Sequence, residues 1–219
     1  MSRTLFLLLL TLVAAIFTMG TTTAKTFRTA NNREYEMAAD YVTVDAENGA
    51  NIFYWMYKVK DEVLKKSQEP LVVWLQGGPG ASSAMGDFCE IGPTEFCQDV
   101  SNGGGDEDHD IRTAPTTTAA TAAASPANYE AKNRSITWMD YASALIFVDQ
   151  PVGSGYSYVS NKKGFARSEQ DLVAHFVTVM RQMYARFPVF HGKPLWIFSE
   201  SYGGKMCSHI GVGLLKKEN

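Results

Sequence analysis

Three short segments of the chain are almost continuously apolar, namely Leu71–Leu75, Ala144–Val148 and Leu195–Ser199. Strands that are covered on both faces of a sheet have this pattern, whereas strands with one wet face alternate apolar and polar residues. Between the second and third segments lie residues 168–187, whose apolar side chains recur at helical spacing until Pro188 ends the pattern. Because strand, helix and strand follow one another, the sequence predicts a parallel sheet with a right-handed crossover.

Further local signals extend this prediction to a whole α/β domain. Residues 41–45 and 52–59 also have strand character, and Ser168 with Asp171 three positions later resembles a capping box. The chain has 219 residues, of which 45% are hydrophobic, and a formal net charge of -3, which is typical of a one-domain globular protein. Because the chain has no excess of positive charge, we expect no nucleic-acid partner.

The first 24 residues read as a secretory signal peptide. Arg3 precedes an apolar stretch over residues 5–17, and small polar residues then lead to a cleavage position after Ala24. The apolar stretch has 13 residues, which is well short of the ~20 that span a bilayer. We therefore expect a secreted chain without a stable membrane anchor, whose domain is residues 25–219.

Residues 101–127 do not fit the α/β pattern. They combine a glycine and acid run with a Thr, Ala and Pro tract, so they offer little apolar surface to offset the entropy of ordering. We interpret this stretch as a low-complexity, disordered surface insertion. A mistranslated segment of a gene would have the same composition, and this alternative stays open.

The cysteines and one glycosylation sequon also bear on a secreted chain. Three cysteines are an odd number, so at least one is free or pairs outside this chain. Cys89 and Cys97 could close a small loop, and Cys207 reads as a buried small hydrophobe, but the sequence does not fix the connectivity. Asn133 begins an Asn-Arg-Ser sequon, which behind a signal peptide predicts glycosylation.

Ser201 follows the third apolar segment and is the candidate nucleophile. A serine hydroxyl needs a base and fixed donors for the oxyanion that develops on the substrate. The α/β-hydrolase fold places such a serine on a sharp turn between strand and helix, with small neighbours. Residues 199–203, Ser-Glu-Ser-Tyr-Gly, follow this pattern with Ser199 in place of the usual first glycine. Serines between small residues are common in turns, so this signal alone is weak.

A glycine-rich loop strengthens the prediction. The first apolar segment is followed by Gln-Gly-Gly-Pro-Gly at residues 76–80. A tight turn alone could require these glycines. In α/β hydrolases, however, one oxyanion donor comes from a loop at this place and another from the backbone after the nucleophile, here Tyr202. Two such loops at the carboxyl ends of parallel strands favour a functional site, since open α/β sheets bind ligands there.

The chain resembles the serine carboxypeptidase family. The segments PLVVWLQGGPGASS at 70–83, FVDQPVGSGYSY at 147–158 and FSESYGGK at 198–205 are similar to three long signatures of that family and occur in the same order. The glutamine at position 76 and the string FSESYGGKM favour the retinoid-inducible branch. The resemblance covers nearly all of the chain from residue 41 onward, apart from the insertion, and implies an α/β-hydrolase fold.

The resemblance also implies roles for individual residues. Ser201 would be the nucleophile, and the backbone N–H groups of Gly78 and Tyr202 would form the oxyanion hole. The site for the substrate's C-terminal carboxylate would consist of Trp74, Gln76, Gly77, Glu90 and Glu200. Two carboxyl groups held together share a proton at mildly acidic pH and can then donate to a peptide carboxylate. This implies peptide or protein C-termini as substrates, an acidic working pH, a secreted, lysosomal or vacuolar location, and no cofactor or metal.

The other members of a catalytic triad are not evident in the chain. His209 is eight residues after Ser201 on the same predicted helix, roughly 12 Å along its axis. His191 precedes the strand, His175 belongs to the crossover helix and His109 lies in the insertion. Asp149 precedes the nucleophile strand, whereas the fold supplies its acid later, so we expect it to fix its own loop.

Three interpretations therefore remain open. In the first, the chain is the N-terminal part of a carboxypeptidase, truncated after the nucleophile helix, and the aspartate and histidine would follow Asn219. In the second, the chain is a secreted non-catalytic homologue that at most binds peptide C-termini. The third is an acyltransferase that uses the same scaffold. The preferred C-terminal residue and the oligomeric state are not readable from the sequence.

Overall fold

The computed structural model describes residues 26–95 and 132–215. Our predictions for residues 1–24 and 101–127, together with those for Cys97 and His109, lie outside the described residues. Cys89 is disulfide-bonded, while Cys207 carries a free, partly buried thiol.

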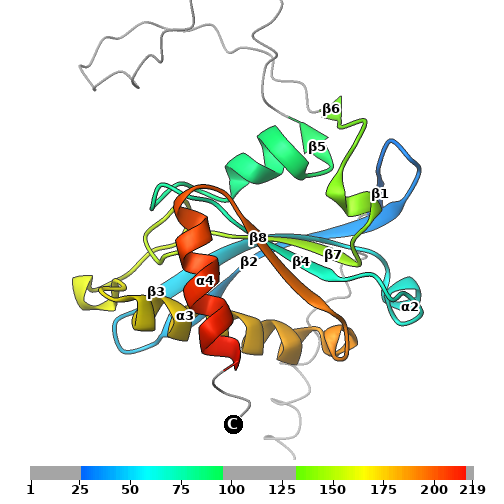
Figure 1. Ribbon diagram of the computed structural model, residues 1–219. Coiled ribbons are helices and arrows are strands. Elements are labelled where there is room, and N and C mark those ends of the chain that lie inside the picture. The colour runs from blue at the N-terminus through cyan, green and yellow to red at the C-terminus, as the bar shows by residue number, and fades with distance from the viewer. Residues whose placement is uncertain (1–25, 96–131, 216–219) are drawn as a thin grey trace, which may run out of the picture.

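A six-stranded mixed sheet forms the centre of the domain (Figure 1). Its strands, in spatial order, are β1 (Thr26–Arg28), β2 (Glu34–Asp45), β3 (Ala50–Lys58), β7 (Ala144–Val148), β4 (Leu71–Leu75) and β8 (Leu195–Ser199). The first three strands and β7 pair in antiparallel fashion. β4 lies between β7 and β8 and is parallel to both.

The three apolar segments form strands with the predicted bounds. The expected burial on both faces is confirmed for β4 and β7, in which every residue is buried. It is wrong for β8, where Trp196 is 53% and Phe198 37% exposed. The reason is position: β8 is an edge strand of the described sheet, and only its other face packs against a helix.

Two helices cover one face of the sheet. The predicted crossover helix is α3 (Glu169–Arg186), and its capping box is confirmed, because the Ser168 hydroxyl and the Asp171 carboxylate each accept from the other's backbone N–H. The second helix is α4 (Tyr202–Leu215), which directly follows β8. The two helices pack against each other and against β2 and β8, with the apolar side of α3 buried (Figure 1).

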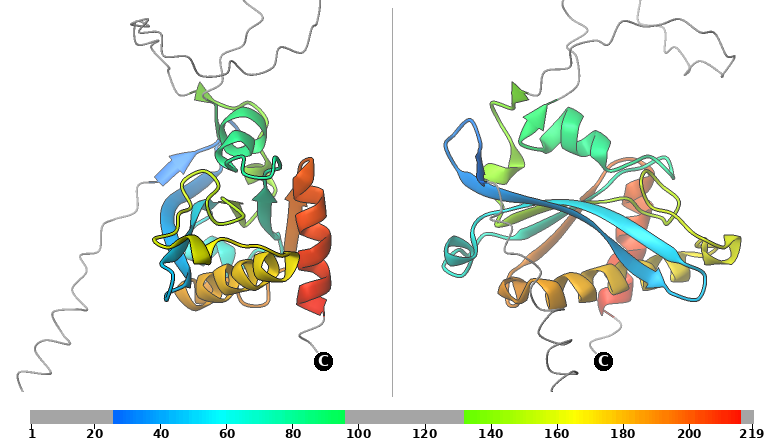
Figure 2. Two further views of the ribbon diagram at one scale, coloured as in Figure 1. Left: turned by 90° about the vertical axis from the view of Figure 1, so that its left-hand side faces the viewer. Right: turned by 180° about the vertical axis from the view of Figure 1, so that it is seen from behind.

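The opposite face carries elements that our strand and helix patterns did not predict. A π-helical turn, η1 (Gly86–Ile91), leads to β5 (Thr94–Glu95), which pairs with β6 (Lys132–Asn133). Figure 2 shows this turn and α3 on opposite sides of the sheet. The remaining short elements are α2 (Asp61–Leu64), η3 (Trp138–Asp140), η4 (Lys162–Gly164) and η5 (Pro188–Phe190).

The hydrophobic core lies on both faces of the sheet, against α3 on one side and towards η1 on the other. Its fully buried side chains include Ile52, Tyr54, Met56, Leu71, Leu75, Leu145, Phe147, Phe176 and Phe190. Because β4 and β7 contribute apolar side chains to both faces, the sheet is fixed from both sides.

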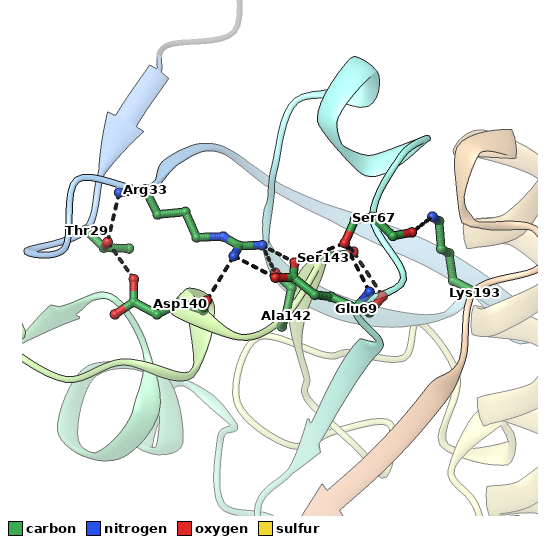
Figure 3. Close-up of polar contacts among 8 residues, drawn as sticks. All are labelled: Thr29, Arg33, Ser67, Glu69, Asp140, Ala142, Ser143 and Lys193. Atoms are coloured by element: carbon green, nitrogen blue, oxygen red, sulfur yellow. Dashed lines mark hydrogen bonds and ion pairs between the residues drawn. The ribbon is translucent and has the colours of Figure 1, made fainter.

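A polar network holds the amino-terminal end of the parallel strands (Figure 3). The Arg33 guanidinium forms an ion pair with Glu69 and donates to the carbonyls of Asp140 and Ala142, at 2.9 and 3.0 Å. Glu69 precedes β4, whereas the two carbonyls precede β7. The pKa of Glu69 is lowered, chiefly by the hydrogen bond from Arg33. The full network consists of Thr29, Arg33, Ser67, Glu69, Asp140, Ala142, Ser143 and Lys193.

We predict that Arg33→Ala lowers the free energy of unfolding by about 1–3 kcal/mol, because it removes donors from two carbonyls as well as an ion pair. Arg28→Ala is the control, since it removes an exposed ion pair with Glu34, which we expect to change stability by less than about 1 kcal/mol. Urea unfolding of both variants measures the difference. Equal losses would contradict the role given to Arg33.

Candidate active site

Ser201 lies on the sharp turn that the sequence predicted. It lies between Glu200, which directly follows β8, and Tyr202, the first residue of α4. Its φ of 53° is in the left-handed region. Non-glycine residues rarely adopt this conformation, which costs of order 1 kcal/mol or more. Hydrogen bonds from Gly203 N–H to the Glu200 carbonyl and from Gly204 N–H to the Ser201 carbonyl, at 2.8 and 3.0 Å, fix the turn. Ser201 is exposed at its top.

The glycine-rich loop after β4 packs directly against this turn. A Cβ atom on Gly77 would lie 2.8 Å from both the Glu200 carbonyl oxygen and the Ser201 Cβ, and 3.0 Å from the Tyr202 nitrogen. Gly203 is equally confined, because its Cβ would lie 2.5 Å from the Leu75 carbonyl oxygen. Only glycine permits these approaches, so both glycines hold the two loops together.

Two backbone donors in these loops bear on the chemistry of Ser201. Among the described residues, no hydrogen bond uses the N–H group of Gly78 or that of Tyr202. Tyr202 is the first residue of α4, where N–H groups lack an intrahelical partner. Gly78 has a φ of 110°, which turns the loop in a way that favours glycine. These are the two N–H groups that the resemblance implied for an oxyanion hole.

The residues expected to bind a carboxylate also meet at this place. Trp74 Nε1 donates to Gln76 Oε1 at 2.8 Å, and Gln76 Nε2 donates to the Glu200 carboxylate. Trp74 and Gln76 are buried at the end of β4, while Glu200 directly follows β8. Glu90 comes from η1, and Gln76 also lies within hydrogen-bonding reach of it. Thus one buried amide lies between two carboxyl groups.

The environment of Glu90 favours its neutral form. Partial burial raises the pKa of Glu90, and the negative charge of Glu200 raises it further, while Arg134 and the hydrogen bond with Gln76 act in the opposite direction. A carboxyl group with a raised pKa keeps its proton at mildly acidic pH and can donate it in a hydrogen bond. A neutral Glu90 can therefore receive an anion, whereas an ionised Glu90 repels one.

A buried carboxylate ties together the loops after β4 and β7. Asp149 Oδ1 accepts from the Ser82 hydroxyl and the Ser83 N–H at 2.8 and 2.7 Å, and its Oδ2 accepts from the Tyr156 N–H at 2.8 Å. Burial raises the pKa of Asp149, and these three hydrogen bonds oppose that rise. The contacts agree with the expectation that Asp149 fixes its own loop.

Ser83 completes this connection and was not singled out from the sequence. Its hydroxyl accepts from the Gln76 N–H at 3.1 Å and donates to the Val148 carbonyl at 2.6 Å. It therefore joins the carboxyl ends of β4 and β7 directly beneath the glycine-rich loop. A small polar pair directly after a buried strand and its glycine turn is a signal that could have identified it.

The described histidines form no contact with Ser201. His209 lies on α4, where its Nδ1 is 2.9 Å from the Lys205 carbonyl and 3.8 Å from Glu169. His191 packs against Tyr184 with ring centroids 5.2 Å apart and the ring planes tilted by 37°. His175 is half-buried on α3, and burial lowers the pKa of its imidazole. Within residues 26–95 and 132–215, no general base is therefore placed at the serine.

Other predicted features lie apart from the site. Asn133 is exposed on β6, and its glycosylation stays a prediction. The described His, Cys, Asp and Glu side chains include no group of three or more that could hold a metal ion. No helix within the described ranges is both long and apolar enough to pass through a bilayer.

Comparisons with known proteins agree with the fold and the motifs. A family model described as serine carboxypeptidase matches residues 28–219. The chain is 36% identical to human (Homo sapiens) retinoid-inducible serine carboxypeptidase over 178 residues, which are 81% of this chain and 31% of that protein. Vitellogenic carboxypeptidase from Aedes aegypti is 29% identical over 82% of this chain and 31% of that protein. The chain thus spans about a third of the length of these relatives.

A solved structure shows the same fold. The crystal structure of a prohormone-processing carboxypeptidase from Saccharomyces cerevisiae superposes with a TM-score of 0.62 and 22% sequence identity. The match covers 84% of this chain and 35% of that one. The predicted α/β-hydrolase architecture is therefore confirmed for the described residues.

We predict that Gly77→Ala destabilises the protein by about 1–3 kcal/mol, because the new methyl group meets backbone atoms of the Ser201 turn that cannot move aside. Gly204→Ala is the matched control: this glycine lies in α4, and a methyl group added to it would have no heavy atom within 4 Å. We expect the control to raise stability by roughly 0.5–1 kcal/mol through helix propensity. Urea denaturation compares the two, and a neutral Gly77→Ala would contradict the close approach of the loops.

Proposed function

The chain belongs to the serine carboxypeptidase family, and from this premise we propose that its site serves a serine-type carboxypeptidase that cleaves C-terminal peptide bonds through an acyl-enzyme. The observation that carries the proposal is that the N–H groups of Gly78 and Tyr202, in the two loops that meet at the strained Ser201 turn, have no acceptor among the described residues. Two fixed donors beside an exposed serine are what acyl transfer to a hydroxyl requires.

In the proposed reaction, the Ser201 hydroxyl attacks the carbonyl carbon of the last peptide bond. The negative charge that develops on the carbonyl oxygen is stabilised by the N–H groups of Gly78 and Tyr202. Collapse of this intermediate releases the C-terminal residue and leaves an ester on Ser201, which water then hydrolyses. A base must take the serine proton and return it to the departing amine.

The same proposal assigns the C-terminal carboxylate of the substrate to Gln76, Gly77, Glu90 and Glu200, with Trp74 orienting Gln76. A protonated Glu90 would donate to that carboxylate, and the amide of Gln76 would supply a second donor. Since the raised pKa of Glu90 favours this state at lower pH, the proposed working range is mildly acidic. A secreted, lysosomal or vacuolar location fits this range and the predicted signal peptide.

A second candidate function is supported by the histidine positions. No described histidine contacts Ser201, so the described residues supply a nucleophile, oxyanion donors and a carboxylate site but no base. In this alternative the chain binds peptide C-termini without turnover. The carboxypeptidase proposal remains the preferred one for the whole protein, because the family motifs include the serine itself.

A fluorophosphonate probe distinguishes these two candidates for the chain of 219 residues. Because an unactivated serine reacts slowly, we expect no stoichiometric labelling of Ser201 by mass spectrometry and no peptidase activity above that of Ser201→Ala. Stoichiometric labelling, together with turnover that Ser201→Ala abolishes, would show that the chain contains its own base.

Carboxylate recognition gives a separate prediction. N-acetyl-Ala-Ala should bind the chain near pH 5. Its affinity should fall by about tenfold per pH unit above the pKa of Glu90, because the ionised carboxylate of Glu90 repels the carboxylate of the peptide. Its C-terminal amide should not bind. Glu90→Gln should keep binding at pH 8, because the neutral amide still donates, whereas the exposed Glu47→Gln should behave as the unmodified chain. Isothermal titration calorimetry measures this; equal affinity for acid and amide would rule out the carboxylate site.

A further inference from the structure

The turn that carries Glu90 is built on a buried carboxyl group. Asp87 lies in η1 and is completely buried. Its Oδ2 accepts from the Tyr57 hydroxyl at 3.0 Å, whereas its Oδ1 has no hydrogen-bond partner among the described residues. An ionised carboxylate would leave a charge buried with a single neutral donor, which is unfavourable. The geometry therefore favours a protonated Asp87.

The groups around Asp87 agree with this protonation state. Tyr57 on β3 and Tyr35 on β2 lie near it, and burial raises the pKa of both hydroxyl groups, so both stay neutral. The cation whose charge acts on Asp87 is Arg134, which follows β6, and the other acid at the site end of the same turn is Glu90. Burial raises the pKa of Asp87 to about 8, against the lowering effects of Tyr57 and Arg134.

Asp87 is also part of the packing that places η1 over the site. Its carbonyl accepts from the Gly92 N–H at 3.0 Å and closes the turn. Arg134 donates to the carbonyls of Phe88 and Gly92 at 2.9 and 3.1 Å, which holds the turn from outside. At the start of the turn, a Cβ on Gly86 would lie only 2.2 Å from Trp74 Nε1.

Trp74 then carries this contact to the carboxylate site. The Trp74 indole N–H, against which Gly86 packs, donates to Gln76 Oε1. Gln76 in turn donates to Glu200. Glu90 sits at the other end of the same six-residue turn. The position of Asp87 therefore bears on both sides of the proposed carboxylate site, through Trp74 and through the turn that carries Glu90.

We propose that Asp87 is a positioning residue for Glu90: in its neutral form it holds the Gly86–Ile91 turn against Tyr57 and Trp74, and its ionisation puts a buried negative charge inside the turn that carries Glu90. The proton of Asp87 passes to solvent and no other group changes. This inference rests on the proposed function in so far as Glu90 binds a peptide carboxylate. It adds a second, more alkaline limit to the pH range of that binding.

The direct test is a carbon-detected NMR titration of the Glu90 carboxyl group in the full chain. Besides the ionisation of Glu90 itself, we expect a second inflection of its chemical shift near pH 8, where Asp87 ionises. Asp87→Asn should remove the second inflection. Asp40→Asn, which removes a partly exposed carboxylate paired with Arg186, should retain it. Persistence of the inflection in Asp87→Asn would overturn the proposal.

A second variant keeps the test decisive if Asp87→Asn does not fold. Tyr57→Phe removes a hydrogen bond that lowers the pKa of Asp87, so the second inflection of Glu90 should move to higher pH. A purely structural role of Tyr57 would leave it in place, and an unmoved inflection would count against the proposal.

Peptide binding then separates this inference from the proposed function. Between pH 7 and pH 9, N-acetyl-Ala-Ala should lose severalfold more affinity for the unmodified chain than for Asp87→Asn. If the peptide binds at no pH while Asp87→Asn still abolishes the second inflection, the coupling between Asp87 and Glu90 stands and the carboxylate-binding function fails. Equal losses of affinity in the two proteins would contradict the effect of Asp87 on the site.

Discussion

The contact between Gly77 and the turn at Ser201 is the constraint on which the site depends. A side chain at position 77 would overlap with the Glu200 carbonyl and with Ser201 itself, so the two loops can meet only as bare backbone. The approach puts Gly77 against the Tyr202 nitrogen, and the N–H groups of Gly78 and Tyr202 have no acceptor among the described residues. It also aligns Gln76 with Glu200. The strained φ of Ser201 is held by these surroundings.

The two ends of the parallel strands differ in their polar contacts. At the amino-terminal end, Arg33 satisfies carbonyl groups and a carboxylate, which fixes the chain where it enters β4 and β7. At the carboxyl end, Ser83 and Asp149 bond to each other and to the backbone, which ties the loops together, while the N–H groups of Gly78 and Tyr202 have no acceptor in the part of the chain that the structure describes. Open α/β sheets commonly separate stability and ligand binding in this way.

The sequence predicted those parts of the fold in which local chemistry decides the structure. The buried strands β4 and β7, the capping box at Ser168 and the turn at Ser201 follow from hydrophobicity, hydrogen-bonding capacity and the small size of neighbouring residues. The sequence did not predict the exposure of β8, which depends on its position at the sheet edge. It also missed Asp87, because nothing in a single sequence shows that this acid is enclosed by side chains from distant strands.

We propose that the loops after β4 and β8 form one preorganised site for a peptide C-terminus. Residue-resolved amide NMR at pH 5, with N-acetyl-Ala-Ala and its C-terminal amide as ligands, tests this claim most directly. We expect the free acid to shift the resonances of the backbone amides of Gly77 and Gly78 and of the side-chain amide of Gln76, while the C-terminal amide leaves them unchanged. Shifts confined to the other end of the sheet, or equal shifts with both ligands, would contradict it.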